Sequence, residues 1–190
     1  MLDIWEVIFI EKPRITNKFV CIKACYLILF IAVLSKETDI QIAHMWAAID
    51  EAKKAFAKGE VPIGAVIVKD GEIIARGHNL TETANDATSH AEINAIREAS
   101  EVLGNWRLSG CEMYVTVEPC TMCAGACLTS RLDAVYAGTE NQRSGAGGSV
   151  RDIFNSSEFK NDIIFEVGLL REECAVLLTE FFRTLRGNNK

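Results

Sequence analysis

The stretch Glu112–Gly138, EMYVTVEPCTMCAGACLTSRLDAVYAG, predicts two strands joined by a helix. Its two ends, Glu112–Val117 and Ala134–Gly138, are apolar and contain the β-branched and aromatic residues that favour strands. We expect the helix over Thr121–Ser130. Because strands that alternate with helices usually pair in parallel, this unit predicts an α/β fold.

Similar patterns extend to both sides of this unit. Thr38–Gly59 carries apolar residues at helical spacing and ends at a glycine. Ile63–Val68 and Glu72–Gly77 flank Asp70-Gly71, and Asp-Gly between β-branched runs predicts a hairpin. Three further elements are expected: a helix over Ser89–Ala99, a short strand over Ile163–Val167 and a last helix over Leu170–Leu185.

Residues 1–37 differ in composition from the rest of the chain. Between Phe19 and Leu34 the sequence is almost wholly apolar, but this run is 16 residues long and contains Lys23. A membrane-spanning helix needs roughly 18 to 20 apolar residues. We therefore expect an N-terminal extension of uncertain role, with a membrane tether as the alternative. A single domain is expected over residues 38–190.

The overall composition limits the class of protein. With 190 residues, 49% hydrophobic and 24% charged, the chain has the composition of one globular domain and not of a disordered protein. The formal net charge of -6 excludes a globally basic nucleic-acid-binding surface, so any RNA site must be a local patch. Seven cysteines, an odd number, fit a reducing cytoplasmic setting better than a disulfide framework.

Two short motifs together predict a metal site. His90-Ala91-Glu92 opens one expected helix, and Pro119-Cys120-Thr121-Met122-Cys123 opens another. They supply one imidazole and two thiols, which are three ligands for a tetrahedral Zn²⁺. Structural zinc sites are closed by four protein ligands, whereas catalytic sites keep one position for water. The ligand count therefore favours catalysis.

The positions of the motifs fit this chemistry. The unpaired N–H groups at helix N-termini stabilise thiolates, and bound zinc lowers the pKa of its water to about 7. Glu92 lies two residues after His90 and can carry a proton from that water to a leaving group.

Three alternatives stay open at this point. Ser89 and Glu92 also form an S-x-x-E capping box, in which Glu92 would serve only the helix start. Cys120 and Cys123 could be a thioredoxin-like redox pair, although this would leave His90 without a role. Cys127 could close the metal site as a fourth ligand, but a cysteine in such a helix is more often part of the core.

The residues resemble a known family, the bacterial tRNA adenosine deaminases of the cytidine deaminase-like superfamily, over about Thr38–Arg186. The resemblance rests on five segments: Gly59–Ala65, His90–Glu92, Glu118–Ala126, Glu173-Cys174 and Phe181–Arg183. It implies a three-layer α/β/α fold with a mixed five-stranded sheet. It also implies hydrolytic conversion of the wobble adenosine of a tRNA to inosine.

The resemblance also implies roles for individual residues. His90, Cys120 and Cys123 would be the zinc ligands and Glu92 the proton shuttle. The substrate contacts would come from a second set: Asn79, Ala91, Asn141, Arg143 and Phe182. The implied partners are the tRNA anticodon loop and a second copy of the chain in a homodimer.

One position departs from the family pattern. Many members carry an acid where this chain has Asn141, while Arg143 keeps the positive charge of the same loop. Asn141 can still accept a hydrogen bond from a ribose hydroxyl. Two rival functions stay open: deamination of free guanine or another small nucleobase or nucleoside, and a thiol redox or structural zinc module.

Overall fold

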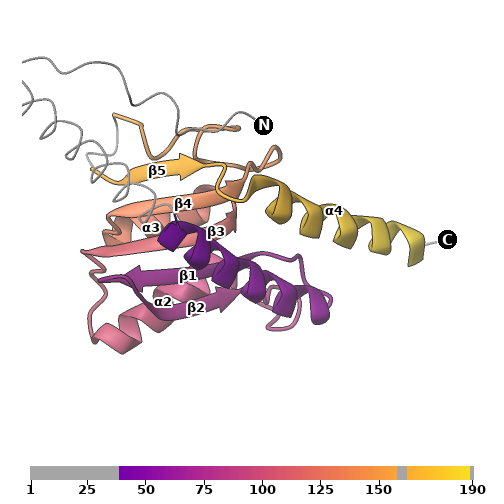
Figure 1. Cartoon of the computed structure of the whole chain (residues 1–190), viewed down its shortest axis with the longest axis horizontal. Coiled ribbons are helices and arrows are strands. Elements are labelled where there is room, and N and C mark those ends of the chain that lie inside the picture. The colour runs from indigo at the N-terminus through magenta and orange to yellow at the C-terminus, as the bar shows by residue number, and fades with distance from the viewer. Residues whose placement is uncertain (1–38, 158–161, 189–190) are drawn as a thin grey trace, which may run out of the picture. The chain divides into compact units, whose positions relative to one another are not determined.

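The computed structural model describes residues 39–157 and 162–188, which contain a five-stranded sheet (Figure 1). The strands are β1 (Gly64–Lys69), β2 (Glu72–His78), β3 (Cys111–Val117), β4 (Ala134–Thr139) and β5 (Ile164–Val167). Their order is β2-β1-β3-β4-β5. β1 is antiparallel to β2 and β3, whereas β3 with β4 and β4 with β5 are parallel. The mixed sheet that we expected is confirmed.

The β1–β2 hairpin turns at the predicted dipeptide. Asp70 has a φ of 51° and Gly71 a φ of 80°. Positive φ at both central residues is what a type I′ turn requires, and this turn matches the right-handed twist of the two strands. Local turn chemistry therefore sets the pairing of β1 with β2.

Helices cover both faces of the sheet. A first helix, described over residues 39–57, and α4 (Arg171–Asn188) lie on one face, and α2 (Ala91–Leu103) and α3 (Thr121–Ser130) lie on the other (Figure 1). Alternate residues of β1 serve the two cores: Ala65 packs on the α2 and α3 side, and Val66 on the side of the first helix and α4. The three-layer architecture is confirmed.

Helix α2 continues one turn beyond its expected end at Ala99. It ends at Leu103 because Gly104 adopts a left-handed φ of 60°, and the Gly104 N–H donates to the Glu101 carbonyl. This is the usual glycine end of a helix. The sequence contains this stop signal, Gly104, but the helical spacing of apolar residues is no longer clear between Ala99 and Gly104.

The expected N-terminal extension, with its apolar run between Phe19 and Leu34, lies outside the described residues. Within the described part of the chain, no helix has both the length and the apolar character needed to cross a membrane.

Two glycines let helices approach the sheet unusually closely. A Cβ atom on Gly64 would collide with the Ala48 carbonyl oxygen of the first helix, and one on Gly77 would collide with the Ala91 carbonyl oxygen of α2. Both clashes are with backbone atoms, which cannot rotate away as a side chain can. The distance between each helix and the sheet therefore depends on glycine at these positions.

We expect Gly77→Ala to lower the free energy of unfolding by about 1–3 kcal/mol or more, because the added methyl group must push α2 off the sheet. Urea denaturation would measure this change. Gly187→Ala is the matched control, since a Cβ there meets open space and alanine favours a helix. Equal stability of Gly77→Ala and the unmodified chain would contradict the prediction.

Candidate active site

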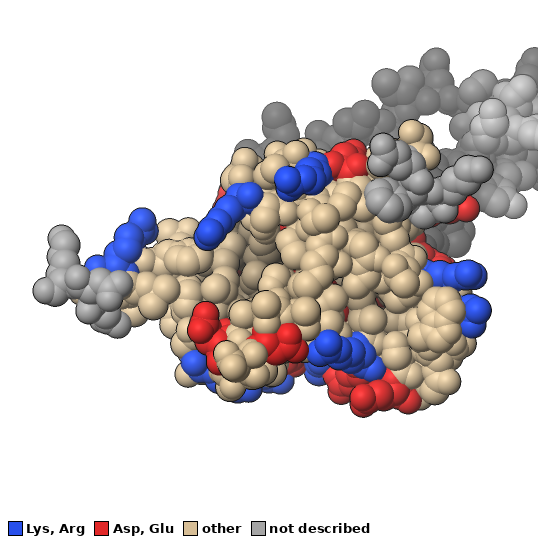
Figure 2. Space-filling view, turned by 180° about the vertical axis from the view of Figure 1, so that it is seen from behind, with Lys and Arg blue, Asp and Glu red and all other residues tan. Residues whose placement is uncertain are grey.

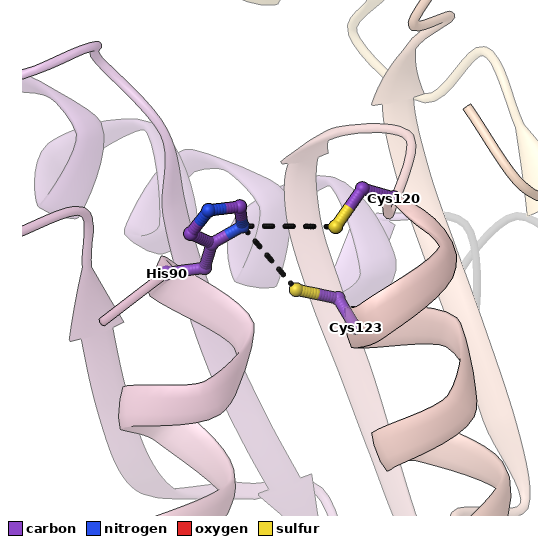
Figure 3. A group of neighbouring side chains, drawn as sticks. All are labelled: His90, Cys120 and Cys123. Carbon is purple, nitrogen blue, oxygen red and sulfur yellow. Dashed lines mark hydrogen bonds between the residues drawn. The ribbon is translucent and has the colours of Figure 1, made fainter. Parts of the chain in front are cut away.

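The N-termini of α2 and α3 bring three metal-binding side chains together. His90 is the N-cap of α2 and Cys120 is the N-cap of α3, with Cys123 one turn into α3. The Nδ1 atom of His90 lies 3.7 Å from Cys120 Sγ and 3.5 Å from Cys123 Sγ (Figure 3). All three ligand atoms lie within 4.8 Å of one another. The predicted convergence of one imidazole and two thiols is confirmed.

These separations fit a tetrahedral metal ion. Zinc bonds of about 2.0 Å to nitrogen and about 2.3 Å to sulfur, at a tetrahedral angle, place nitrogen and sulfur roughly 3.5 Å apart. The two nitrogen–sulfur distances in the structure, 3.7 and 3.5 Å, are close to this value. One nitrogen and two sulfur donors suit a borderline-soft transition metal. The residues therefore form a candidate metal site.

Cys127 does not complete this site. Its side chain is fully buried in the core between the sheet and the helices α2 and α3, and its Sγ lies 4.0 Å from Met113 Sδ. The prediction that Cys127 belongs to the core is confirmed. Among the described residues, the group whose donor atoms lie close enough together to hold a metal ion consists of His90, Cys120 and Cys123.

The capping-box alternative for Glu92 is wrong. The N-cap of α2 is His90 rather than Ser89, and no side chain caps this helix end. The Ser89 hydroxyl donates to Asn94 Oδ1, and the Ser89 N–H donates to the Asp86 carbonyl. The Glu92 side chain is 3% exposed, and its Oε2 atom has no hydrogen-bond partner among the described residues. Glu92 Oε2 therefore does not hold the described part of the fold together through a hydrogen bond.

The titration behaviour of the site follows from burial and close contacts. Burial raises the pKa of Glu92 to about 6. The Cys123 thiol donates to Cys120, and together with His90 it lowers the pKa of Cys120 to about 4. The same contact raises the pKa of Cys123, because its proton is held between the two sulfurs. A carboxyl group that titrates near neutral pH beside a thiolate is the behaviour expected of a reaction site.

A cleft of about 670 Å³ opens beside the metal group. It is lined by His90, Glu92 and Cys120 and by four of the predicted substrate residues: Asn79, Asn141, Arg143 and Phe182. Ala91, the fifth, is fully buried and does not line the cleft. Of the two neighbouring phenylalanines of α4, Phe181 is buried and Phe182 is 44% exposed.

Two buried carboxylates in the cleft walls had no predicted role. Glu60 accepts hydrogen bonds from the backbone N–H groups of Glu82 and Thr83 and from Asn79 Nδ2. Glu60 lies in the segment Gly59–Ala65 that carries part of the family resemblance, but that segment gave it no role of its own. Its role depends on a contact with residues about 20 positions later in the chain, which a local pattern cannot show.

Glu118 holds the glycine-rich loop that forms another wall. It accepts hydrogen bonds from the backbone N–H groups of Asn141, Gly147 and Ser149 and from the Ser149 hydroxyl. Gly145 packs so closely that a Cβ there would collide with the Glu118 carboxylate. Burial alone would raise the pKa of Glu118, but these donors hold it below its ordinary value.

Within that loop, Asn141 uses its side chain for local structure. Its Oδ1 accepts the N–H groups of Arg143 and Ser144, and its Nδ2 donates to Ser144 Oγ. An amide oxygen has two lone pairs, so a ribose hydroxyl would have to compete with these bonds. Asn141 therefore shapes the wall that carries Arg143.

Comparison with known proteins is decisive for the family. Residues 39–186 match the family model described as MafB19-like deaminase. The tRNA-specific adenosine deaminase of Bacillus subtilis (strain 168) is 48% identical over 147 residues, which cover 77% of this chain and 91% of that protein. The chain belongs to the tRNA-specific adenosine deaminase family. A relative with the same description from Aquifex aeolicus (strain VF5) is 46% identical over 141 residues, 74% of this chain and 93% of its own.

Solved structures of this family and of a related one share the fold. A structure from studies of A-to-I editing by tRNA:A34 deaminases at the wobble position of transfer RNA is 43% identical, with a TM-score of 0.69, and the match covers 72% of this chain and 99% of the other. The guanine deaminase of Nitrosomonas europaea is 25% identical, with a TM-score of 0.65 over 74% of this chain and 83% of its own. The redox alternative has no comparable support.

We expect about one bound transition-metal ion per chain, and its loss in His90→Ala and Cys123→Ala, because each substitution removes one of three ligands. Elemental analysis after dialysis would measure it. Bound metal should also fall as the pH is lowered, since the thiolates and the imidazole must be deprotonated to bind. Cys127→Ala, a matched buried cysteine on the same helix, should keep the metal. Full metal content in Cys123→Ala would refute the assignment.

Proposed function

We propose that the chain hydrolyses the wobble adenosine of a tRNA anticodon to inosine, with Zn²⁺ held by His90, Cys120 and Cys123. The convergence of these three donors beside the buried carboxyl of Glu92, in one cleft, carries the proposal. The 48% identity to the Bacillus subtilis tRNA-specific adenosine deaminase supports the choice of substrate.

The reaction consumes water and releases ammonia. When bound, zinc would lower the pKa of a water so that it loses a proton near neutral pH and becomes a nucleophile for carbon 6 of adenine. Glu92 takes a proton from the attacking water and delivers it to the departing amino group. Its unpartnered Oε2 and its raised pKa of about 6 suit a group that must both accept and release a proton. The carbonyl oxygen on carbon 6 of inosine comes from the water, and the second proton of the water ends on N1 of the base.

The proposal assigns the cleft residues to an anticodon nucleotide that has left its stack. Asn79 contacts the base, and Phe182, which is 44% exposed, offers a ring on which a loop base can stack. Arg143 supplies positive charge for the ribose-phosphate backbone. Asn141 holds the loop that carries Arg143. Ala91 is buried and does not line the cleft, so the proposal gives it no contact with the base.

The purified enzyme should convert adenosine to inosine in an anticodon stem-loop with adenosine at the wobble position. Glu92→Gln should lower kcat by about 10²- to 10⁴-fold and keep the bound metal, because it removes the proton carrier but no ligand. Mass spectrometry of the digested RNA measures inosine, and elemental analysis measures the metal. Full activity of Glu92→Gln would refute the proton-transfer role.

Deamination of free guanine is the second candidate, because the Nitrosomonas europaea guanine deaminase shares the fold. Ammonia release from free guanine, adenine and adenosine should therefore be measured in parallel. We expect the stem-loop to be the preferred substrate by a large factor in kcat/KM. Turnover of guanine together with an unmodified stem-loop would overturn the tRNA assignment.

We also propose a homodimer that forms through the face covered by α2 and α3. On this face the charged side chains gather toward the edges and leave a broad uncharged area (Figure 2). Met122 of α3 is 36% exposed there, and a Cβ on Gly125 of the same helix would meet open space. Such an uncharged surface is typical of an interface core.

Sedimentation velocity should give the mass of two chains for the unmodified protein. Gly125→Arg should shift it to one chain, because a charged side chain in the centre of an interface is costly. Gly187→Arg, which places the same side chain in open space on α4, should remain a dimer. A monomeric unmodified protein would exclude the proposal.

A further inference from the structure

Glu60 is a buried carboxylate in the cleft wall that the proposed reaction does not use. Its side chain is 1% exposed, and it lines the same cleft as Glu92. Its Oε1 accepts the Thr83 N–H at 2.6 Å, and its Oε2 accepts the Glu82 N–H at 3.3 Å and Asn79 Nδ2 at 3.2 Å. Burial alone would raise the pKa of Glu60, but the Thr83 and Glu82 donors hold it below its ordinary value. Glu60 is therefore ionised at neutral pH and can only accept hydrogen bonds.

An acceptor at this place decides which way the Asn79 amide faces. The two ends of an asparagine amide have almost the same shape, so hydrogen-bond partners determine its orientation. The Glu60 carboxylate requires the NH₂ end of Asn79, and the Thr81 hydroxyl donates to Asn79 Oδ1 at 2.9 Å. Both ends of the amide are thus fixed, and one N–H of Nδ2 remains for a ligand in the cleft.

We propose that Glu60 is a positioning residue that presents the Asn79 NH₂ group as a hydrogen-bond donor to a ring nitrogen of the bound purine. This inference rests on the proposed deamination of a purine in the cleft. Of the adenine ring nitrogens, N1 lies next to the reacting carbon, so N3 and N7 are the acceptors available to a residue in the wall. Glu60 acts through Asn79 and does not touch the base.

The substitution Glu60→Gln tests this directly because it keeps the shape but reverses the polarity. Its amide oxygen takes the short bond from the Thr83 N–H, and its NH₂ group then faces Asn79. Asn79 must turn its oxygen toward that group, and its NH₂ end then meets the Thr81 hydroxyl, which can accept as well as donate. The donor to the base is lost although no cavity is created.

The measurement is a double-mutant-type cycle, in which one change is made in the protein and the other in the substrate. The substrates are anticodon stem-loops with adenosine, 3-deazaadenosine or 7-deazaadenosine at the wobble position, and kcat/KM is measured for each. With the unmodified enzyme, kcat/KM for one of the two deaza substrates should be about tenfold or more below the value that its intrinsic reactivity predicts. The reason is that the missing ring nitrogen leaves the Asn79 donor unpaired. Asn79→Ala supplies the baseline ratio that reflects intrinsic reactivity alone.

In Glu60→Gln we expect kcat/KM for adenosine to fall about tenfold and the adenosine-to-deaza ratio to fall to the Asn79→Ala baseline. The double variant Glu60→Gln with Asn79→Asp should behave in the same way, because its acceptors complement the new NH₂ group but cannot donate to the base. Bound metal per chain should stay near that of the unmodified enzyme, and thermal stability should fall only slightly, because the long Glu82 N–H bond loses its acceptor. Glu51→Gln changes a buried glutamate of the first helix that does not line the cleft, and this variant should keep the unmodified ratio.

The unmodified enzyme could deaminate adenosine and yet give, with both deaza substrates, the same adenosine-to-deaza ratio of kcat/KM as Asn79→Ala. This result would overturn the inference about Glu60 but leave the proposed function intact. A Glu60→Gln enzyme that keeps the unmodified ratio, or loss of folding in both Glu60 variants, would also overturn it, since Glu60 would then be purely structural. No reaction of the unmodified enzyme with the adenosine stem-loop would instead defeat the proposed function, and the inference with it.

Discussion

The close approach of the Gly77 and Ala91 backbones sets the position of the candidate metal site. Ala91 is the first residue of α2 and follows the N-cap His90, so the close approach at Gly77 fixes the first turn of this helix against the end of β2. On the other side, α3 joins two parallel strands and must therefore begin at the C-terminal end of β3. The N-termini of both helices meet at one end of the sheet, where an imidazole from one faces two thiols from the other.

Three buried glutamates share the cleft, and their surroundings give them different chemistry. Glu60 and Glu118 each receive several backbone N–H donors, which hold the pKa of both carboxyls below the ordinary value in spite of burial. Glu92 has one oxygen without a partner among the described residues, and burial raises its pKa to about 6. Two of the carboxylates thus stay ionised and hold loops in place, while the third can exchange a proton near neutral pH. The division of roles follows from the number of donors around each group.

The parts of the molecule that depend on local chemistry could be predicted from the sequence. The Asp70-Gly71 turn lies in two adjacent residues, and the short motifs that contain His90, Cys120 and Cys123 are each recognisable locally. The turn and the convergence of the three side chains are confirmed. The capping box at Ser89 fits an equally local pattern, but Asp86 and Asn94 compete for the Ser89 backbone and side chain, and the helix begins one residue later. The walls of the cleft depend on bonds between residues about 20 to 30 positions apart, such as those of Glu118 with Gly147 and Ser149. Periodicity and motif spacing do not predict such bonds, so the sequence analysis could not assign Glu60 and Glu118 a role in the cleft walls.

The hydrogen bonds of Asn141 explain how the loop accommodates an asparagine where the family pattern has an acid. An acid, which the family resemblance implies at this position, could accept the N–H groups of Arg143 and Ser144 equally well, but it could not donate to Ser144 Oγ as Asn141 Nδ2 does. It would also place a further negative charge in a wall that already contains Glu118 and Glu140. A phosphate of an RNA loop is repelled by each such charge within a Debye length, about 8 Å at physiological salt. The amide therefore keeps the turn that carries Arg143 and makes the rim of the cleft less negative, which favours the approach of a polyanion to a chain whose net charge is -6.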